Sequence, residues 1–158
     1  MDLFRRRPRG LYFEEFEIGQ TITTAARTVT ESDVVSFAGL TGDFNQIHID
    51  AEFSQNSPFG QRVAHGLLVL SISMGLVVQT GVMEGTVLAF REIQEWKFSK
   101  PVFLGDTLHV ELTVVETKDI PRLGGGSVLI EAKVMNQRAE IVNKGVWNAL
   151  LASRQKGN

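Results

Sequence analysis

Apolar and polar residues alternate along most of the second half of the chain, which is the pattern of half-buried strands. In the segment 108–115, leucine and valine occupy every second position and mainly polar residues stand between them. The same alternation predicts a strand at 128–134, and further strands are expected at 86–90, 93–99 and 141–152. The glycine-rich segment 123–127 predicts a loop that joins the two long strands beside it.

The first half of the chain shows helical periodicity instead. The segment 64–80 is apolar nearly all round, which predicts a helix at the centre of the molecule. A shorter helix is expected to begin after Thr30, which forms a capping box with Asp33, and to end at Gly42. Before it, the β-branched run 21–29 predicts a strand.

The segment 43–61, between the two predicted helices, has no clear period and is expected to be irregular, with a short helical turn begun by Asp50. A strand, a pair of helices and a run of antiparallel strands define an α+β domain, with one sheet wrapped around the long helix. We expect one domain over residues 1–158, with an N-terminal extension at 1–18 and a core of about 19–153.

Composition excludes several classes of function. A formal net charge of -2 argues against broad nucleic-acid binding. The absence of cysteine excludes disulfides, thiolate metal sites and cysteine nucleophiles, and it fits a reducing cytoplasm. The most apolar run, 67–78, is shorter than the roughly 20 residues of a membrane span. No apolar stretch follows the N-terminal arginines, so no secretory signal is expected. We therefore expect a cytoplasmic protein with neither membrane nor nucleic-acid partners.

The densest polar cluster, TGDFNQIH at 41–48, follows the first predicted helix. On a continuous helix Asp43 and His48 would point about 140° apart, so a turn, favoured by Gly42 and Asn45, must bring them together. A carboxylate and an imidazole that share one water form an acid–base unit near neutral pH. The residues alone leave a second interpretation open, in which a helix end and a turn make His48 merely structural.

A second cluster, VAHGL at 63–67, lies at the start of the long helix, where free backbone N–H groups face the positive end of the helix dipole. Because Gly66 lacks a side chain, a substrate carbonyl could approach its N–H closely. Tight packing of the helix entrance explains this glycine equally well. His109, on the polar side of its strand, is given no role.

Other motifs are weaker. No phosphate-binding loop, metal-ligand motif or nucleophile elbow is present in the sequence. The arginines at 5–7 could contact the phosphates of coenzyme A, but a solvated chain end is the simpler interpretation.

The run FAGLTGDFNQIH at 37–48 resembles the signature of the MaoC-like family, which includes the (R)-specific enoyl-CoA hydratases. That signature has an aromatic residue, small residues and then Gly-Asp-x-Asn-Pro-apolar-His. The resemblance continues through AHGLL at 64–68 and FSKPVFLGD at 98–106. These matches follow one another in order and leave only the two ends of the chain uncovered.

The resemblance implies a hot-dog fold, in which a curved antiparallel sheet wraps the long helix, and at least a homodimer with the substrate channel between subunits. It implies that Asp43 and His48 hold the water that adds to C3 of a trans-2-enoyl thioester. Gly66 would polarise the thioester oxygen through its N–H. Asn45 would order the catalytic loop and, with His65, belong to the substrate-binding region. No metal and no cofactor are implied, because coenzyme A or an acyl carrier enters as part of the substrate.

Two positions depart from the family pattern. Gln46 replaces the proline, which removes a preset backbone angle. Met74 aligns with a serine that supports the site in some members, and Ser71 and Ser73 are nearby. The expected protein is a hydro-lyase, an (R)-specific enoyl-CoA hydratase or 3-hydroxyacyl-thioester dehydratase. The alternatives are a mesaconyl-type hydratase of branched or dicarboxylic acyl-CoA, a hot-dog thioesterase and a non-catalytic acyl-CoA-binding subunit.

Overall fold

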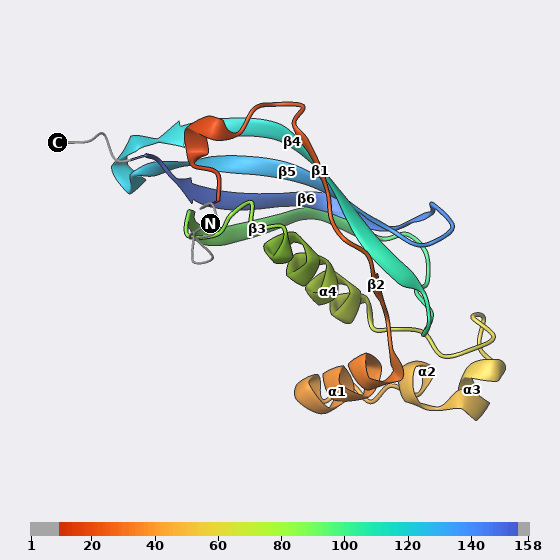
Figure 1. Cartoon of the computed structure of the whole chain (residues 1–158). Helices are drawn as coiled ribbons and strands as arrows, with labels where there is room; N and C mark the ends of the chain where they lie inside the picture. Colours follow the sequence, from red (N-terminus) through yellow and green to blue (C-terminus); the bar gives the residue numbers. More distant parts are fainter. Residues whose placement is uncertain (1–9, 155–158) are drawn as a thin grey trace, which may run out of the picture.

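The computed structural model describes residues 10–154 and shows an antiparallel sheet that curves around one long helix (Figure 1). The sheet order is β1-β4-β5-β6-β3, and β2 also pairs with β4. The strands are β1 (Thr21–Thr23), β2 (Arg27–Thr28), β3 (Val87–Phe98), β4 (Thr107–Ile120), β5 (Gly125–Met135) and β6 (Ile141–Ala152). The predicted α+β class is confirmed.

Helix α4 (Gly66–Gln79) lies against one face of the sheet, as the apolar segment 64–80 predicts. It buries Leu68, Val69, Leu76 and Val77 against the alternate apolar residues of β4 and β5. Each buried leucine or valine contributes about 1.5–3 kcal/mol, so this contact stabilises the fold substantially. None of the helices within residues 10–154 is both long and apolar enough to cross a membrane.

Helix α1 (Glu31–Thr41) begins and ends where the capping residues predict. The Asp33 N–H donates to Thr30 Oγ1 at 3.2 Å, and the Thr30 N–H donates to Asp33 Oδ2 at 2.8 Å. Gly42 ends the helix in the left-handed conformation, with φ 79°. The capping box therefore sets where α1 begins, and Gly42 sets the point at which the chain leaves α1 toward the candidate site.

The segment expected to be irregular holds two short helices, α2 (Gln46–Ile49) and α3 (Ala51–Gln55). Asp50 caps α3, which confirms the predicted helical turn. Asn45 caps α2 by accepting the Ile47 N–H at 3.3 Å. Helix α2 is a single turn, too short for periodicity to reveal.

Three strand predictions need correction. The single strand 21–29 is two short strands, because Thr24 turns its hydroxyl toward the Val110 N–H at 3.0 Å and takes the place of a backbone partner. The strands 86–90 and 93–99 are one strand, β3, whose register shifts at bulges. The predicted loop 123–127 is strand from Gly125 onward, and the turn is the 3-10 helix η2 (Pro121–Leu123) with Gly124.

Residues 10–18 also pack against the sheet. A 3-10 helix, η1 (Phe13–Glu15), precedes Phe16, whose side chain belongs to the hydrophobic core. Leu11 N–H donates to the Val82 carbonyl at 2.8 Å. The core therefore begins earlier than the predicted boundary at 19. The arginines at 5–7 lie outside the described residues.

The edge of the sheet formed by β3 and β6 carries an aromatic cluster on its helix side. The Trp96 and Trp147 rings stack with centroids 5.8 Å apart, and Phe90 meets Trp147 edge-on at 6.0 Å. Gly145 makes room for this stack, because a side chain there would collide with Trp96. Trp147 is fully buried and ties the edge strand to the core.

Candidate active site

Asp43 lies in the tight loop between α1 and α2. Its N–H donates to Thr41 Oγ1 at 3.2 Å, and its Oδ1 accepts the Asn45 N–H at 3.3 Å. The residue is exposed, so its carboxylate keeps access to solvent and to a ligand. The left-handed backbone of Gly42 turns the chain here and allows Asp43 to face back toward α2.

His48 is on α2 and is buried, with 8% of its surface exposed. Its Nδ1 lies 2.8 Å from the Val63 carbonyl oxygen. Because a carbonyl oxygen only accepts, Nδ1 carries the ring proton, and Nε2 of the neutral ring is left as an acceptor. The Arg62 guanidinium donates to the His48 carbonyl at 2.6 Å and pairs with Glu31 at 2.9 Å. These contacts fix α2 against α1 and the chain before α4.

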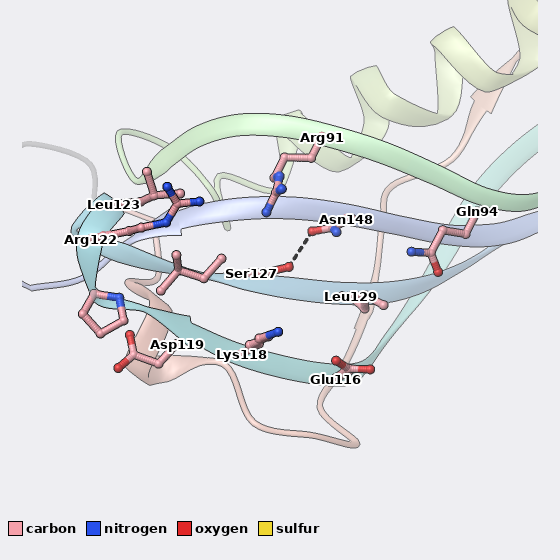
Figure 2. A pocket seen from close by; sticks show the side chains of 12 residues that line it. Arg91, Gln94, Glu116, Lys118, Asp119, Arg122, Leu123, Ser127, Leu129 and Asn148 are labelled. Atoms are coloured by element: carbon pink, nitrogen blue, oxygen red, sulfur yellow. Dashed lines mark hydrogen bonds between the residues drawn. The ribbon is translucent and has the colours of Figure 1, made fainter.

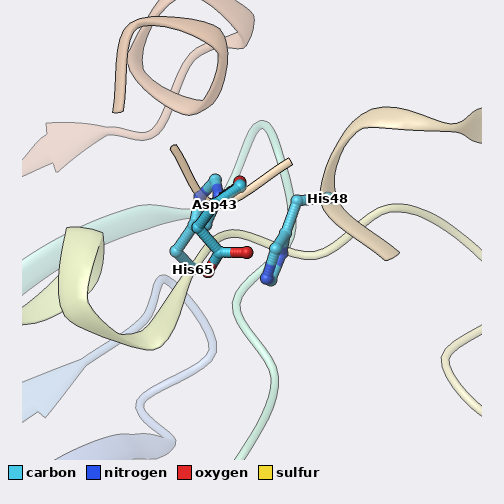
Figure 3. A group of neighbouring side chains, drawn as sticks. All are labelled: Asp43, His48 and His65. Atoms are coloured by element: carbon cyan, nitrogen blue, oxygen red, sulfur yellow. Dashed lines mark hydrogen bonds between the residues drawn. The ribbon is translucent and has the colours of Figure 1, made fainter. Parts of the chain in front are cut away.

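The structure brings Asp43 and His48 together, as Figure 3 shows. One nitrogen or carboxylate oxygen from each of Asp43, His48 and His65 lies within 4.8 Å of the others. Within residues 10–154, no hydrogen bond joins the Asp43 carboxylate to the His48 ring. A single water bonded to both groups, about 2.8 Å from each, spans such a separation. The pair can therefore hold and polarise one water.

The electrostatics of the site favour a neutral imidazole. Burial holds the pKa of His48 below its usual range, and the neighbouring His65 ring lowers it further, while the Val63 carbonyl and the Asp43 carboxylate oppose this shift. A neutral His48 at physiological pH has an unprotonated Nε2 that can take a proton from water. The environment thus suits His48 to act as a base.

His65 lies behind this pair rather than at the surface. It is the residue before α4 and has only 2% of its surface exposed. Its Nε2 is 2.9 Å from the Asp43 carbonyl oxygen, and its ring stacks on His48 with centroids 3.8 Å apart. The centroid of the Phe37 ring, on α1, lies 5.0 Å from the centroid of the His65 ring.

Gly66 is the first residue of α4, where backbone N–H groups have no acceptor within the helix. A Cβ added at Gly66 would lie 2.6 Å from Phe98 Cε1. The Phe98 ring therefore requires a glycine at position 66 for packing. This requirement is compatible with a substrate carbonyl approaching the Gly66 N–H. Phe98, with 55% of its surface exposed, is a site residue that the sequence marked only as the start of a motif.

Of the two departures from the family pattern, the one at Gln46 has a local explanation. Gln46 is the first residue of α2, the helix position at which proline fits because its N–H has no helical partner. Glutamine forms the same turn, since Asn45 caps it. Ser73 and Ser71 each donate to the carbonyl four residues earlier, at 2.7 and 2.8 Å, so their hydroxyls are engaged within α4.

The cluster of Asp43, His48 and His65 is poorly arranged for a metal ion. The two imidazole planes differ by only 29° and overlap in a stack. Ligand lone pairs lie in the ring plane, so a cation about 2.1 Å from one nitrogen could not lie in both planes unless a ring turned. The arrangement fits acid–base chemistry better than metal binding. His109 is not part of the cluster; its Nε2 is 3.7 Å from Glu111.

Two cavities, of about 800 and 390 Å³, lie away from this cluster, and neither is lined by Asp43, His48 or His65. Figure 2 shows the larger one, where Ser127 donates to Asn148 Oδ1 at 2.6 Å. It lies on the sheet face that does not pack against α4. At the cluster itself, Asp43 is exposed, so the candidate site is open to solvent on the side of this residue.

Comparison with known proteins agrees with this geometry. Residues 14–135 match the model of the MaoC like domain family. The chain is 41% identical over 109 residues to protein MaoC of Klebsiella aerogenes, covering 69% of this chain and 32% of that protein. It is 37% identical over 107 residues to an (R)-specific enoyl-CoA hydratase of Rhodospirillum rubrum, covering 65% of this chain and 69% of that protein. The chain thus spans about a third of the length of the Klebsiella protein.

Solved structures show the same fold. A protein of Archaeoglobus fulgidus described as a monoamine oxidase regulatory protein is 39% identical, with a TM-score of 0.87 over 94% of this chain and 98% of that one. A Mycobacterium tuberculosis protein with a double hot-dog fold has a TM-score of 0.80 at 19% identity, over 94% of this chain and 46% of its own. The predicted hot-dog fold is therefore confirmed.

Proposed function

Because the chain belongs to the MaoC-like domain family, we propose that it is a hydro-lyase that adds water to a 2-enoyl thioester or removes it from a 3-hydroxyacyl thioester. The observation that carries this proposal is the Asp43 carboxylate beside the neutral His48 imidazole, at a separation that one water spans. The relative named (R)-specific enoyl-CoA hydratase supports the R-specific form of the reaction and coenzyme A as the carrier.

In the hydration direction, the bound water donates one hydrogen bond toward His48 Nε2 and another toward Asp43. Its oxygen adds to C3 of the enoyl group, one of its protons passes to His48 Nε2, and the resulting imidazolium gives that proton to C2 as the product forms. One water is consumed and the protein returns to its starting state. The Asp43 carboxylate stabilises the imidazolium that forms for a moment.

The N-terminus of α4 supports the other half of this chemistry. As water attacks C3, negative charge develops on the thioester oxygen, and a backbone N–H aimed at that oxygen stabilises it. Gly66 offers such an N–H at the positive end of the helix dipole. The mechanism requires no metal and no resident cofactor, since coenzyme A arrives with the substrate. The proposal includes a cytoplasmic location, in keeping with a sequence that has no cysteine.

The proposed assembly is a homodimer with the substrate channel between subunits. Strand β3 is the last strand of its sheet, so one of its edges has no partner strand within residues 10–154. Its large apolar side chains are exposed, and such an edge is usually covered. They are Val87, Leu88, Phe90, Ile93 and Phe98. A second copy against β3 would cover them and enclose the open site.

The test of the proposed function follows the absorbance of the conjugated enoyl thioester in crotonyl-CoA mixed with the purified protein. We expect rapid loss with the unaltered protein and a decrease in rate of at least about 100-fold in Asp43→Asn or His48→Gln. His109→Gln is the matched control, because His109 lies outside the site, and it should keep full activity.

Full activity in both site variants would refute the proposal. Release of free thiol would instead indicate a thioesterase, and ligand binding without turnover would indicate a non-catalytic subunit. If hydration is found, a panel of straight, branched and dicarboxylic thioesters assigns the acyl group, including the mesaconyl type.

A further inference from the structure

We propose that His65 is a positioning residue, which holds the main chain of Asp43 and the ring of His48 in place and does not bind substrate. Its catalytic consequence rests on the proposed function. The positioning itself is a property of the folded chain, and it can be measured without any substrate.

The first support is the place of His65 in the hydrogen bonding of the catalytic loop. Its Nε2 is 2.9 Å from the Asp43 carbonyl oxygen, across 22 positions of the sequence. Within the described chain, the other hydrogen bonds of residues 42–45 join residues at most four positions apart. His65 therefore provides the one direct hydrogen bond from this exposed loop to the start of the buried helix α4.

The second support is the ring stack. The His65 and His48 centroids are 3.8 Å apart, and Figure 3 shows the His48 ring beside the Asp43 carboxylate. The Val63 carbonyl holds one edge of the His48 ring through Nδ1. Contact with the face of His65 restricts rotation of that ring, so Nε2 keeps its direction. The loop and the base are thus held by one side chain.

The chemistry of the His65 nitrogens argues against contact with substrate. The Asp43 carbonyl accepts the proton of Nε2, so this donor is already engaged. The other nitrogen, Nδ1, is buried and has no partner within residues 10–154. A residue that recognises a thioester oxygen needs a free donor that the ligand can reach, and neither nitrogen of His65 meets this condition.

The stack also has an electrostatic consequence for His48. The groups that face His48 are the Asp43 carboxylate from the loop, the His65 imidazole from the start of α4 and the Arg62 guanidinium, which is paired with Glu31. A second imidazole against its ring disfavours protonation of His48. Burial acts in the same direction and is the larger effect, whereas Asp43 opposes both.

Two variants separate the contributions of His65. His65→Gln keeps an N–H donor that can reach the Asp43 carbonyl but removes the ring, and His65→Phe keeps a ring but removes the donor. We expect kcat for crotonyl-CoA to fall about 10- to 100-fold in each, as for small displacements of catalytic groups. KM should stay within about twofold, because the ground-state contacts with substrate are intact. Raised KM at unchanged kcat would instead support substrate binding and overturn the proposal.

The deciding measurement is the titration of His48, followed by the NMR signals of the imidazole C–H groups in the free protein. The chain has only three histidines, so His48→Gln and His109→Gln variants assign the signals. We expect the pKa of His48 to rise in both His65 variants, and the acid limb of the rate profile to move to higher pH. An unchanged His48 titration in both folded variants would overturn the proposal, whether or not the protein hydrates crotonyl-CoA. A shifted titration in a protein without hydratase activity would refute only the proposed function.

Discussion

Among single residues, Gly66 has the most direct structural explanation. The ring of Phe98 occupies the space that any side chain at Gly66 would need, and the contact lies at the entrance of helix α4. Phe98 is half-exposed, so a larger residue at Gly66 would displace its ring at the entrance of the helix. The side chain at position 66 therefore affects both the packing of Phe98 and the access of a ligand to the N-terminus of α4.

Gly66→Ala should lower the free energy of unfolding by about 1–3 kcal/mol, the usual cost of overpacking. Gly75→Ala in the same helix is the matched control, because a Cβ there has nothing within 4 Å. It should stabilise the protein by about 0.5–1 kcal/mol, because alanine is a better helix former. Urea unfolding measures both. The double variant Gly66→Ala/Phe98→Ala should regain stability but not full activity, because the alanine methyl group still hinders the approach of a substrate oxygen to the N–H of residue 66.

His48 predicts a pH dependence of stability. Burial lowers its pKa in the folded protein, so the unfolded chain binds more protons as the pH falls below about 6.5. The protein should therefore lose stability from that pH down to the lowered pKa of His48, and keep the contribution above it. His48→Gln should show a smaller loss of Tm between pH 7.5 and pH 5.5 than the unaltered protein. Equal losses in the two proteins would contradict the assigned shift.

The elements of the first half could be predicted where local chemistry determines them. The capping box of Thr30 and Asp33 and the stop at Gly42 define α1 without any tertiary contact. The residues alone left the meeting of Asp43 with His48 as one of two interpretations, and the family resemblance favoured it. The turn between them depends on α2 and its cap at Asn45. The tie from His65 to Asp43 joins residues 22 positions apart, and no local pattern reveals it.

Strand β5 shows why the sequence pattern predicted a loop where the structure has a strand. Glycine is the usual sign of a turn, yet Gly125 and Gly126 are strand residues whose missing side chains allow close packing. A Cβ at Gly125 would collide with the Leu151 carbonyl, and one at Gly126 with the ring of Phe13. Both neighbours are distant in sequence, so the chain pattern alone could not distinguish this strand from a loop.

These contacts predict different costs for two adjacent substitutions. Gly126→Ala should lower the free energy of unfolding by about 1–3 kcal/mol, and Phe13→Ala should relieve much of that loss, because a side chain is the obstacle. Gly125→Ala should cost more and should not be relieved by Phe13→Ala, since the main chain of β6 cannot move aside. Equal midpoints of urea unfolding for the two single variants would contradict this ranking.

For the whole molecule, the open edge of the sheet at β3 is the place where we propose that a second copy of the chain binds. Leu88 on this edge is 50% exposed and Val115 on β4 is 42% exposed, so the two positions present similar apolar surface. Only Leu88 lies on the edge that we propose a second copy covers. Leu88→Lys should therefore shift the sedimentation of the protein from dimer toward monomer and lower its activity. Val115→Lys should change neither, and equal behaviour of the two variants would reject the β3 interface.

The stacked tryptophans of β3 and β6 allow that edge to be followed by intrinsic fluorescence. Trp96 and Trp147 are the only tryptophans of the chain, and their rings lie together beneath the exposed strand. Intrinsic fluorescence therefore reports on one place rather than on an average over the fold. A red shift of emission marks the loosening of β3 from β6, and a change of emission on dilution, at constant circular dichroism, would record separation of subunits without an attached dye.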